Sequence, residues 1–305
     1  MKEIVRITVG LTVSCLLAGA VMGGMFVMTA KAKKRNERLR MQETMLSLLG
    51  YNKATPPPSG LKLYDIYRYV IEDGDKRQTG YVLPLRNGGD MAYALLVMDL
   101  RGRFDGLLEL RISPEEAKEA APRENAMKAA MTPPRAFSYA DTTIIAKIGE
   151  KRTAYLLPGE FPGYKTFIRV ILALDPGFQI IGLEIMEHEE DPGLGAEIEE
   201  TYFKDQFKDK TYEKVRGLKV VKEPLPEEYK RYLEATEAMK KEHFSREDIN
   251  RIRNKYQDKD IYALTGATIS SEAVTEGVQN MTRKFAYRIM ALDELVAGRG
   301  LLAAF

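Results

Sequence analysis

A glycine and several hydroxyl-bearing residues stand directly ahead of a long apolar-periodic segment near the carboxyl end of the chain. Residues 264–272 read Leu-Thr-Gly-Ala-Thr-Ile-Ser-Ser-Glu, and the apolar pattern runs from 273 to 295. This pattern predicts a helix, whose first amides lack intrahelical partners and whose dipole places partial positive charge at its start. Because Gly266 lets the backbone approach a ligand closely, the stretch predicts a phosphate-binding site.

The hydroxyl residues also have a simpler interpretation. Serine is one of the preferred N-cap residues, so Ser270 or Ser271 could serve only to cap the helix that follows. Local chemistry favours this simpler interpretation, and the rest of the chain has to decide between the two.

A second polar segment lies some seventy residues earlier. Residues 188–195 read His-Glu-Glu-Asp-Pro-Gly-Leu-Gly. Pro192 and Gly193 favour a tight turn after a strand, and Gly195 allows backbone amides to face a ligand. On its own, the segment has the alternative interpretation of an ordinary surface turn.

Together, the two segments resemble the FMN-binding domain found in the RnfG component of the Rnf electron-transport complex and in the NqrC component of the sodium-pumping NADH:quinone reductase. Residues 265–271 match the signature [S/T]-G-A-T-x-[S/T]-S, and residues 188–195 match H-x-E-T-P-G-L-G with Asp191 in place of threonine. The resemblance implies an FMN esterified through its phosphate to the side-chain oxygen of Thr268. The cofactor-binding residues that it implies are Thr265, Gly266, Ala267, Thr268, Ser270, Ser271, His188, Glu190, Asp191, Pro192, Gly193, Leu194 and Gly195.

Two positions depart from the family pattern. Asp191 lacks the hydroxyl that the family's threonine would donate to the flavin, and its carboxylate would disfavour an anionic reduced flavin. Tyr262 stands where the family usually has an aspartate three residues before the first hydroxyl of the signature. Asp260, two residues upstream, is the candidate substitute in recognition by the flavin transferase.

His188 invites an assignment as an acid or base. Electron transfer through a flavin requires no proton abstraction from a substrate, and a single histidine beside Glu189 and Glu190 is typical of a residue that orients a loop. We therefore predict no catalytic side chain in this protein.

Charge and composition exclude several other classes of protein. The 46 basic and 44 acidic residues give a net charge of +2, which lacks the one-sided basic surface of a nucleic-acid-binding protein. The single cysteine, Cys15, lies in an apolar run, so disulfides, thiolate metal sites and iron–sulfur ligation are not expected. With only two histidines in the chain, no metal site is predicted.

The amino end predicts a membrane anchor, residues 1–32. Residues 7–30 contain no charged side chain, and a helix of this length crosses a hydrocarbon core of about 30 Å. A cleaved signal peptide is the alternative, because residues 30–32 have the A-x-A shape of a cleavage site. The apolar run exceeds the usual length of a signal peptide, and Lys31 lies inside that site, so we favour an uncleaved anchor.

Two lines of reasoning predict opposite orientations of the anchor in the membrane. Six basic residues between 31 and 40 follow the apolar run, which alone would place the following domain in the cytoplasm. The family resemblance implies a domain on the extracytoplasmic side of the inner membrane. We predict the extracytoplasmic location.

Beyond the anchor, the sequence predicts an α+β fold of antiparallel strands with flanking helices. A juxtamembrane helix and proline-rich linker cover 33–60. Matching strand patterns beginning near Tyr81 and Tyr155 recur at a spacing near 75 residues, which we interpret as a duplicated strand meander. The expected domains are a first repeat at 61–150 and an FMN-binding domain at 151–305, the latter containing a helical segment at 196–212 and a charged helical insertion at 222–260.

The resemblance implies a membrane-anchored electron-carrier subunit of an Rnf-type ion-translocating ferredoxin:NAD oxidoreductase. Its expected partners are the other membrane subunits of that complex and a flavin transferase. Two alternatives stay open: a component of the sodium-pumping quinone reductase, and a membrane-tethered scaffold that has lost its cofactor. The sequence alone does not separate the first alternative from the Rnf-type assignment.

Overall fold

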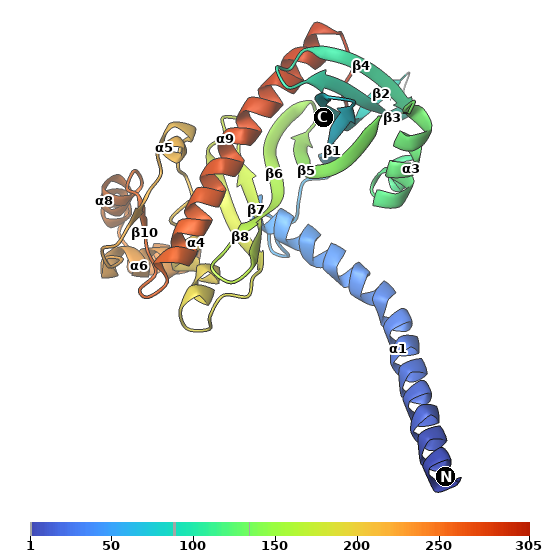
Figure 1. Cartoon of the computed structure of the whole chain (residues 1–305). Helices are drawn as coiled ribbons and strands as arrows, with labels where there is room; N and C mark the ends of the chain where they lie inside the picture. The colour runs from blue at the N-terminus through green and yellow to red at the C-terminus, as the bar shows by residue number, and fades with distance from the viewer. Residues whose placement is uncertain (1, 88–89, 134) are drawn as a thin grey trace. The chain divides into compact units, whose positions relative to one another are not determined.

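The computed structural model describes residues 2–87, 90–133 and 135–305 and divides the chain into two compact units, 1–54 and 55–305 (Figure 1). The first unit is built on one helix, α1 (Lys2–Leu48), in which the expected membrane segment and juxtamembrane segment are continuous. This helix is long and apolar enough to cross a membrane.

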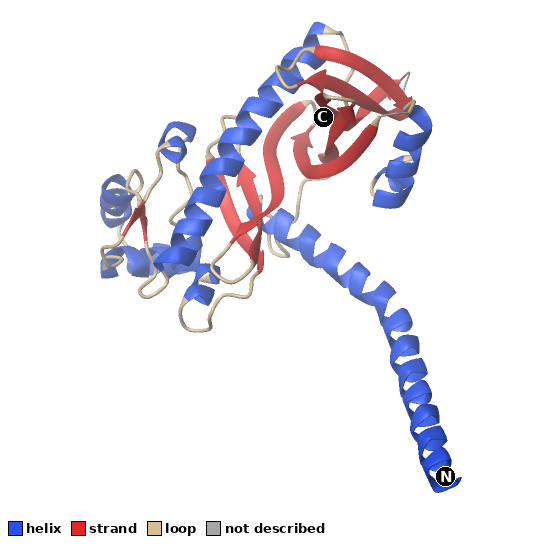
Figure 2. Ribbon diagram, viewed as in Figure 1, coloured by secondary structure: helices blue, strands red, loops and turns tan. Residues whose placement is uncertain are grey.

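The second unit is organised around an antiparallel eight-stranded sheet, drawn in red in Figure 2, with the strand order β4-β3-β2-β1-β5-β6-β7-β8. Sheet and helices together confirm the expected α+β class. The strands are β1 (Leu61–Asp73), β2 (Lys76–Asn87), β3 (Asp90–Asp99), β4 (Phe104–Leu110), β5 (Ala136–Ile148), β6 (Lys151–Pro162), β7 (Phe167–Leu174) and β8 (Ile180–Glu187).

The strand order shows two four-stranded meanders, β1–β4 and β5–β8, joined where β1 pairs antiparallel with β5. The starts of β1 and β5 are 75 residues apart (61 to 136), as are those of β2 and β6 (76 to 151). The repeat seen in the sequence therefore contains one more strand per copy than its apolar runs indicate. The domain boundary expected at residue 150 stays a prediction.

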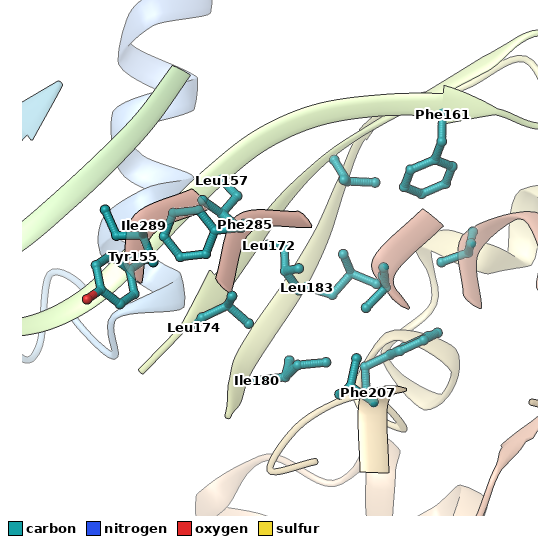
Figure 3. Packing of buried hydrophobic residues seen from close by; sticks show 14 of the residues in the cluster. Tyr155, Leu157, Phe161, Leu172, Leu174, Ile180, Leu183, Phe207, Phe285 and Ile289 are labelled. Atoms are coloured by element: carbon teal, nitrogen blue, oxygen red, sulfur yellow. The ribbon is translucent and has the colours of Figure 1, made fainter. Parts of the chain in front are cut away.

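Helix α9 (Thr268–Gly298) covers one face of the sheet, and its apolar side chains pack on alternate residues of β6, β7 and β8 (Figure 3). Phe285 meets Tyr155 edge-on with ring centroids 4.9 Å apart. Near its start the helix lies so close to β6 that a Cβ atom on Gly277 would stand 2.4 Å from the Phe161 ring. A second apolar cluster lies between the first meander and helices α2 (Pro114–Ala117) and α3 (Ala120–Ala130).

The segment at 196–212, expected to be helical, is only partly so and is not one continuous helix. It forms a 3₁₀ turn, η1 (Gly195–Glu199), and a short helix, α4 (Thr201–Lys204), separated by the extended backbone of Glu200. The break lets Phe203 and Phe207 enter the core, where both are fully buried. Helix α5 (Tyr212–Arg216) follows.

The charged insertion at 222–260 is helical in the structure. It contains α6 (Glu227–Glu234), α7 (Glu237–His243) and α8 (Arg246–Tyr256), and α6 and α8 pack on a cluster rich in tyrosine. The two-stranded sheet of β9 (Val220–Val221) and β10 (Ile261–Tyr262) brings the ends of the insertion together. Strand β10 leads directly into residues 264–268, so the insertion borders the predicted phosphate site.

Candidate functional site

The predicted phosphate site lies at the amino end of α9, and Thr268 is the first residue of that helix. Its N-cap residue is Ala267, whose side chain makes no capping bond. Within the described residues, the amides of positions 268–270 donate to no protein acceptor. Gly266 has a φ of 77°, a left-handed conformation that favours glycine. This helix start therefore leaves donors available to an anion.

The capping interpretation of the two serines is wrong, because the helix begins five residues earlier than the apolar pattern indicates. Ser271 lies inside the first turn, fully buried, and its hydroxyl is used twice. It accepts a hydrogen bond of 3.0 Å from the amide of Leu264 and donates one of 3.0 Å to the carbonyl of Ala267. Ser271 thus holds the turn that presents Thr268.

The loop at 188–195 packs directly against this turn. A Cβ atom on Gly266 would lie 2.9 Å from Leu194 Cδ2, and one on Gly195 would lie 2.8 Å from Ser270 Oγ. Close approach therefore requires the glycine at 195, whereas the left-handed φ favours the glycine at 266. The fold brings together two segments that are seventy residues apart in the sequence, as the resemblance implies. Pro192 and Gly193 are exposed at the tip of the loop, with a φ of 73° at Gly193.

Glu190 connects three segments around the site. Its side chain is buried, and one carboxylate oxygen accepts hydrogen bonds from the amides of Tyr164 at 2.8 Å and Lys165 at 3.3 Å. The other oxygen accepts from the hydroxyl of Ser270. The carboxylate thereby ties the β6–β7 turn and the loop to the first turn of α9. Because both of its oxygens accept hydrogen bonds from protein groups, Glu190 holds the segments of the site in place.

His188 orients the same loop. Its Nδ1 accepts a hydrogen bond of 3.0 Å from the amide of Glu190, and its Nε2 lies 3.0 Å from Glu199 Oε1. This pattern assigns the ring proton to Nε2, because Nδ1 acts as an acceptor. Both ring nitrogens are used within the protein, in keeping with the interpretation of His188 as an orienting residue.

Asp191, the first departure from the family motif, forms an ion pair with Lys165, whose Nζ lies 2.5 Å from Asp191 Oδ1. The hydrogen bond from Lys165 to Asp191 raises the pKa of the Lys165 ammonium. The added carboxylate beside the site therefore comes with its own counter-charge. Lys165 is not among the site residues predicted from the sequence, because a lysine in a hairpin turn gives no signal that it reaches a loop 26 residues later.

Tyr262 and Asp260, the second departure, both have structural partners. The amide of Tyr262 donates to Gln206 Oε1 at 2.8 Å, and its ring lies 6.5 Å from that of Tyr229 in the insertion. Asp260 Oδ1 accepts a hydrogen bond of 2.7 Å from Lys214 Nζ. The chain before Thr265 is therefore anchored by Gln206, the insertion and α5.

A buried lysine supports the same stretch of chain. Lys210 is 2% exposed, and its ammonium donates to the carbonyls of Gln257 at 2.9 Å and Lys259 at 2.7 Å. Burial lowers the pKa of Lys210 to about 8, from 10.5. Between these two pH values the unfolded chain binds a proton that the folded chain has lost.

The free energy of unfolding should therefore rise with pH from about 8 towards 10, by up to about 1.4 kcal/mol per pH unit from this group. Above pH 10 the tyrosines of the unfolded chain ionise while buried ones such as Tyr81 stay protonated, which lowers stability. Urea unfolding at pH 8.0 to 9.5 should show the rise in the unmodified chain and in Lys208→Met, an exposed control. Lys210→Met should lack it, and an equal slope in all three proteins would contradict the prediction.

Comparison with known protein families supports a ligand site at the start of α9. Residues 163–283 match the sequence model of the FMN-binding domain family. The matched range begins at the β6–β7 turn that binds Glu190 and includes the loop, the insertion and the first half of α9.

Two relatives of known name show which members of this family the chain is similar to. Over 134 residues the chain is 35% identical to the G component of the proton-translocating ferredoxin:NAD(+) oxidoreductase complex of Clostridium ljungdahlii, a match that covers 44% of this chain and 54% of the relative. Over 60 residues it is 38% identical to the G component of the ion-translocating oxidoreductase complex of Pasteurella multocida, covering 19% of this chain and 30% of the relative. The chain thus spans about half the length of the first relative and less of the second. The resemblance to an RnfG-type protein is confirmed.

Two solved structures are also similar to this chain. One is NqrC from Shewanella oneidensis, with a TM-score of 0.33, 18% identity and coverage of 46% of this chain and 54% of the other. The second is the C component of the Na(+)-translocating NADH-quinone reductase from Parabacteroides distasonis, with a TM-score of 0.30, 21% identity and coverage of 46% and 58%.

Proposed function

We propose that this chain is a membrane-anchored, flavin-carrying subunit of an Rnf-type ion-translocating ferredoxin:NAD oxidoreductase, with FMN attached covalently through its phosphate to Thr268. The observation that carries the proposal is the helix start at Thr268. Three amides there have no acceptor among the described residues, and a loop of the matching family motif lies against them. The family match over 163–283 supports FMN as the cofactor.

The residues of the site fit a phosphate on the first turn of α9. Amides 268–270 would bind its oxygens, and Gly266 permits the close approach of the backbone. In the proposed ester, Thr268 Oγ1 would be bonded to the phosphorus of FMN: the hydroxyl loses its proton and the phosphate loses the oxygen-linked group that the hydroxyl displaces, so the product is the chain plus one FMN less one water. When bound, FMN supplies the electron-transfer chemistry.

The remaining motif residues have supporting parts in this proposal. The exposed loop tip at 192–194 would border the flavin ring, with Thr265 and Ala267 beside the phosphate. Glu190, His188 and Ser271 hold these segments in place through the bonds described above. The Asp191–Lys165 pair would lie at the rim of the site. A flavin transferase and the other membrane subunits of the complex are the partners.

Denaturing electrophoresis tests this function directly. Membranes containing the chain together with its flavin transferase should show a band at 34.5 kDa that fluoresces under ultraviolet light, because only covalent flavin survives denaturation. A cofactor-less scaffold would give no fluorescence. Membership in a sodium-pumping quinone reductase would also give a fluorescent band, and co-purification with a ferredoxin-oxidising or a quinone-reducing complex separates these two cases.

For the membrane topology, we propose that α1 anchors the chain in the inner membrane and that residues 55–305 lie on the extracytoplasmic side. A reporter that is active only in the cytoplasm, joined to the carboxyl end by a flexible linker, should stay silent. A reporter active only outside the cytoplasm should be active at the same place. The reverse result would mean that the basic residues 31–40 determine the orientation.

A further inference from the structure

A cavity lies on the α9 face of the first meander, away from the predicted flavin site. It has a volume of about 350 Å³ and is bordered by β1, β2, β3 and the carboxyl-terminal half of α9. Lys284 on its wall is 16 residues beyond Thr268, which corresponds to about 24 Å along a helix. The cavity is therefore separate from the site at the start of α9.

The register of β1, β2 and β5 determines which side chains form the floor of the cavity. Arg68 on β1 pairs with Tyr81 on β2 and with Asp141 on β5, so the three side chains stand in a row on one face of the sheet. Arg68 donates to Asp141 through Nε at 3.0 Å and Nη2 at 2.5 Å, and Arg288 from α9 donates to it at 2.9 Å. One carboxylate thus serves two guanidinium groups, which leaves an excess positive charge.

Two further charged residues determine the net charge of the cavity. The ammonium of Lys284 forms no ion pair within the described parts of the chain, so it adds a second uncompensated positive charge. Asp99, also on the wall, is neutralised by Arg103 at 2.6 Å and accepts hydrogen bonds from two backbone amides. The cavity therefore carries a net charge of about +2 and attracts an anion.

Apart from Thr79, the rest of the wall is apolar or aromatic. Tyr81 and Met98 are buried on the sheet, whereas the ring of Tyr287 on α9 is 62% exposed. Burial raises the pKa of Tyr81 to about 12, so its hydroxyl keeps a proton that it can donate. A cationic wall facing aromatic and thioether side chains suits a ligand with an anionic end and an apolar body.

We propose that this cavity binds a small organic anion in which a phosphate or carboxylate is carried by an aromatic or apolar body. Lys284, Arg288 and Arg68 would hold the anionic end, and Tyr287 with Met98 would cover the body. Such a ligand could be a soluble metabolite or the head of an anionic lipid, since both present the same chemistry. This site is independent of the flavin function proposed above.

The proposal is tested by titrating 1-naphthyl phosphate into the full chain made together with its flavin transferase, in detergent, so that the phosphate site at Thr268 is already filled, and measuring binding by calorimetry. We expect saturable binding with one site per chain. Inorganic phosphate and 1-naphthol should each bind more weakly, because each lacks one half of the ligand. Lys284→Gln should weaken the binding of 1-naphthyl phosphate about tenfold, as expected for one charge-assisted contact.

Arg283→Gln is the matched control, because Arg283 is the adjacent exposed cation and does not border the cavity. On the apolar side, Tyr287→Ala should weaken binding while Met290→Ala, exposed and also outside the cavity, should not. An equal loss in Arg283→Gln and Lys284→Gln would show non-specific attraction and overturn the proposal, as would the absence of saturable binding.

The origin of the ligand is decided by placing the chain in phosphatidylcholine nanodiscs with and without phosphatidate. If phosphatidate prevents the binding of 1-naphthyl phosphate to the unmodified chain, the site accepts a lipid head. If it has no effect while naphthyl phosphate binding persists, the site accepts a soluble anion. Both results support the site itself.

Discussion

Replacing Thr268 by alanine should remove covalent flavin completely while leaving the fold intact. The two serines that follow Thr268 are already engaged, since Ser270 donates to Glu190 and Ser271 bridges Leu264 and Ala267. They are therefore poor substitutes as ester-forming groups. Alanine is also a good helix former, so the start of α9 should persist.

The measurement is in-gel fluorescence of chain produced together with the transferase, normalised to protein stain. Glu276→Gln, an exposed change two turns further along α9, should fluoresce like the unmodified chain. Thermal unfolding should show that Thr268→Ala is folded. A Thr268→Ala band that fluoresces normally would mean that the flavin is attached elsewhere.

Glu190→Ala should have the largest effect on the site without touching Thr268. It leaves the amides of Tyr164 and Lys165 and the hydroxyl of Ser270 without their acceptor, at an expected cost of about 3 kcal/mol in unfolding free energy. The loop would also lose its side-chain hydrogen bond to α9, so covalent flavin should fall at least tenfold.

Urea unfolding and in-gel fluorescence measure the two effects. Glu189→Ala removes the adjacent exposed carboxylate and should change neither quantity. Glu190→Gln keeps one acceptor oxygen, so it should retain part of both the stability and the flavin. If Glu190→Ala behaves like Glu189→Ala, Glu190 does not hold the site together.

Much of the candidate site could be predicted from two short segments. Each segment is local in the chain, and glycine at 266 and 195 reflects backbone requirements that a sequence displays directly. The structure adds the physical reason for both glycines, because Gly266 has a left-handed φ and a Cβ atom on Gly195 would collide with Glu190 and Ser270. The antiparallel α+β class followed from apolar runs separated by turns.

The supporting contacts could not be predicted, because they join residues far apart in sequence. The pairs Lys165–Asp191, Gln206–Tyr262 and Lys210–Lys259 are separated by 26, 56 and 49 residues. No local sequence pattern indicates a contact between residues so far apart in the chain. A lysine with a buried ammonium looks the same in sequence as an exposed one such as Lys208.

Differences in element boundaries have local causes. The apolar pattern places the start of α9 five residues late because threonine, isoleucine and serine have modest helix propensity and serine is a common cap. The helix expected at 196–212 is interrupted, because aromatic residues at helical spacing also suit short turns that bury them separately. Strands β1 and β5 fall outside the apolar runs that define the repeat, because Asp65 and Arg68 interrupt β1 and Asp141, Thr142 and Thr143 interrupt β5.

The position of the flavin on Thr268 is tested most directly by mass spectrometry of the chain made together with its active transferase. The intact mass should increase by one FMN less one water, and fragmentation should localise the addition to the peptide that contains Thr268. An unmodified mass, with the transferase shown to be active on another substrate, would contradict the flavin assignment and favour a scaffold without cofactor.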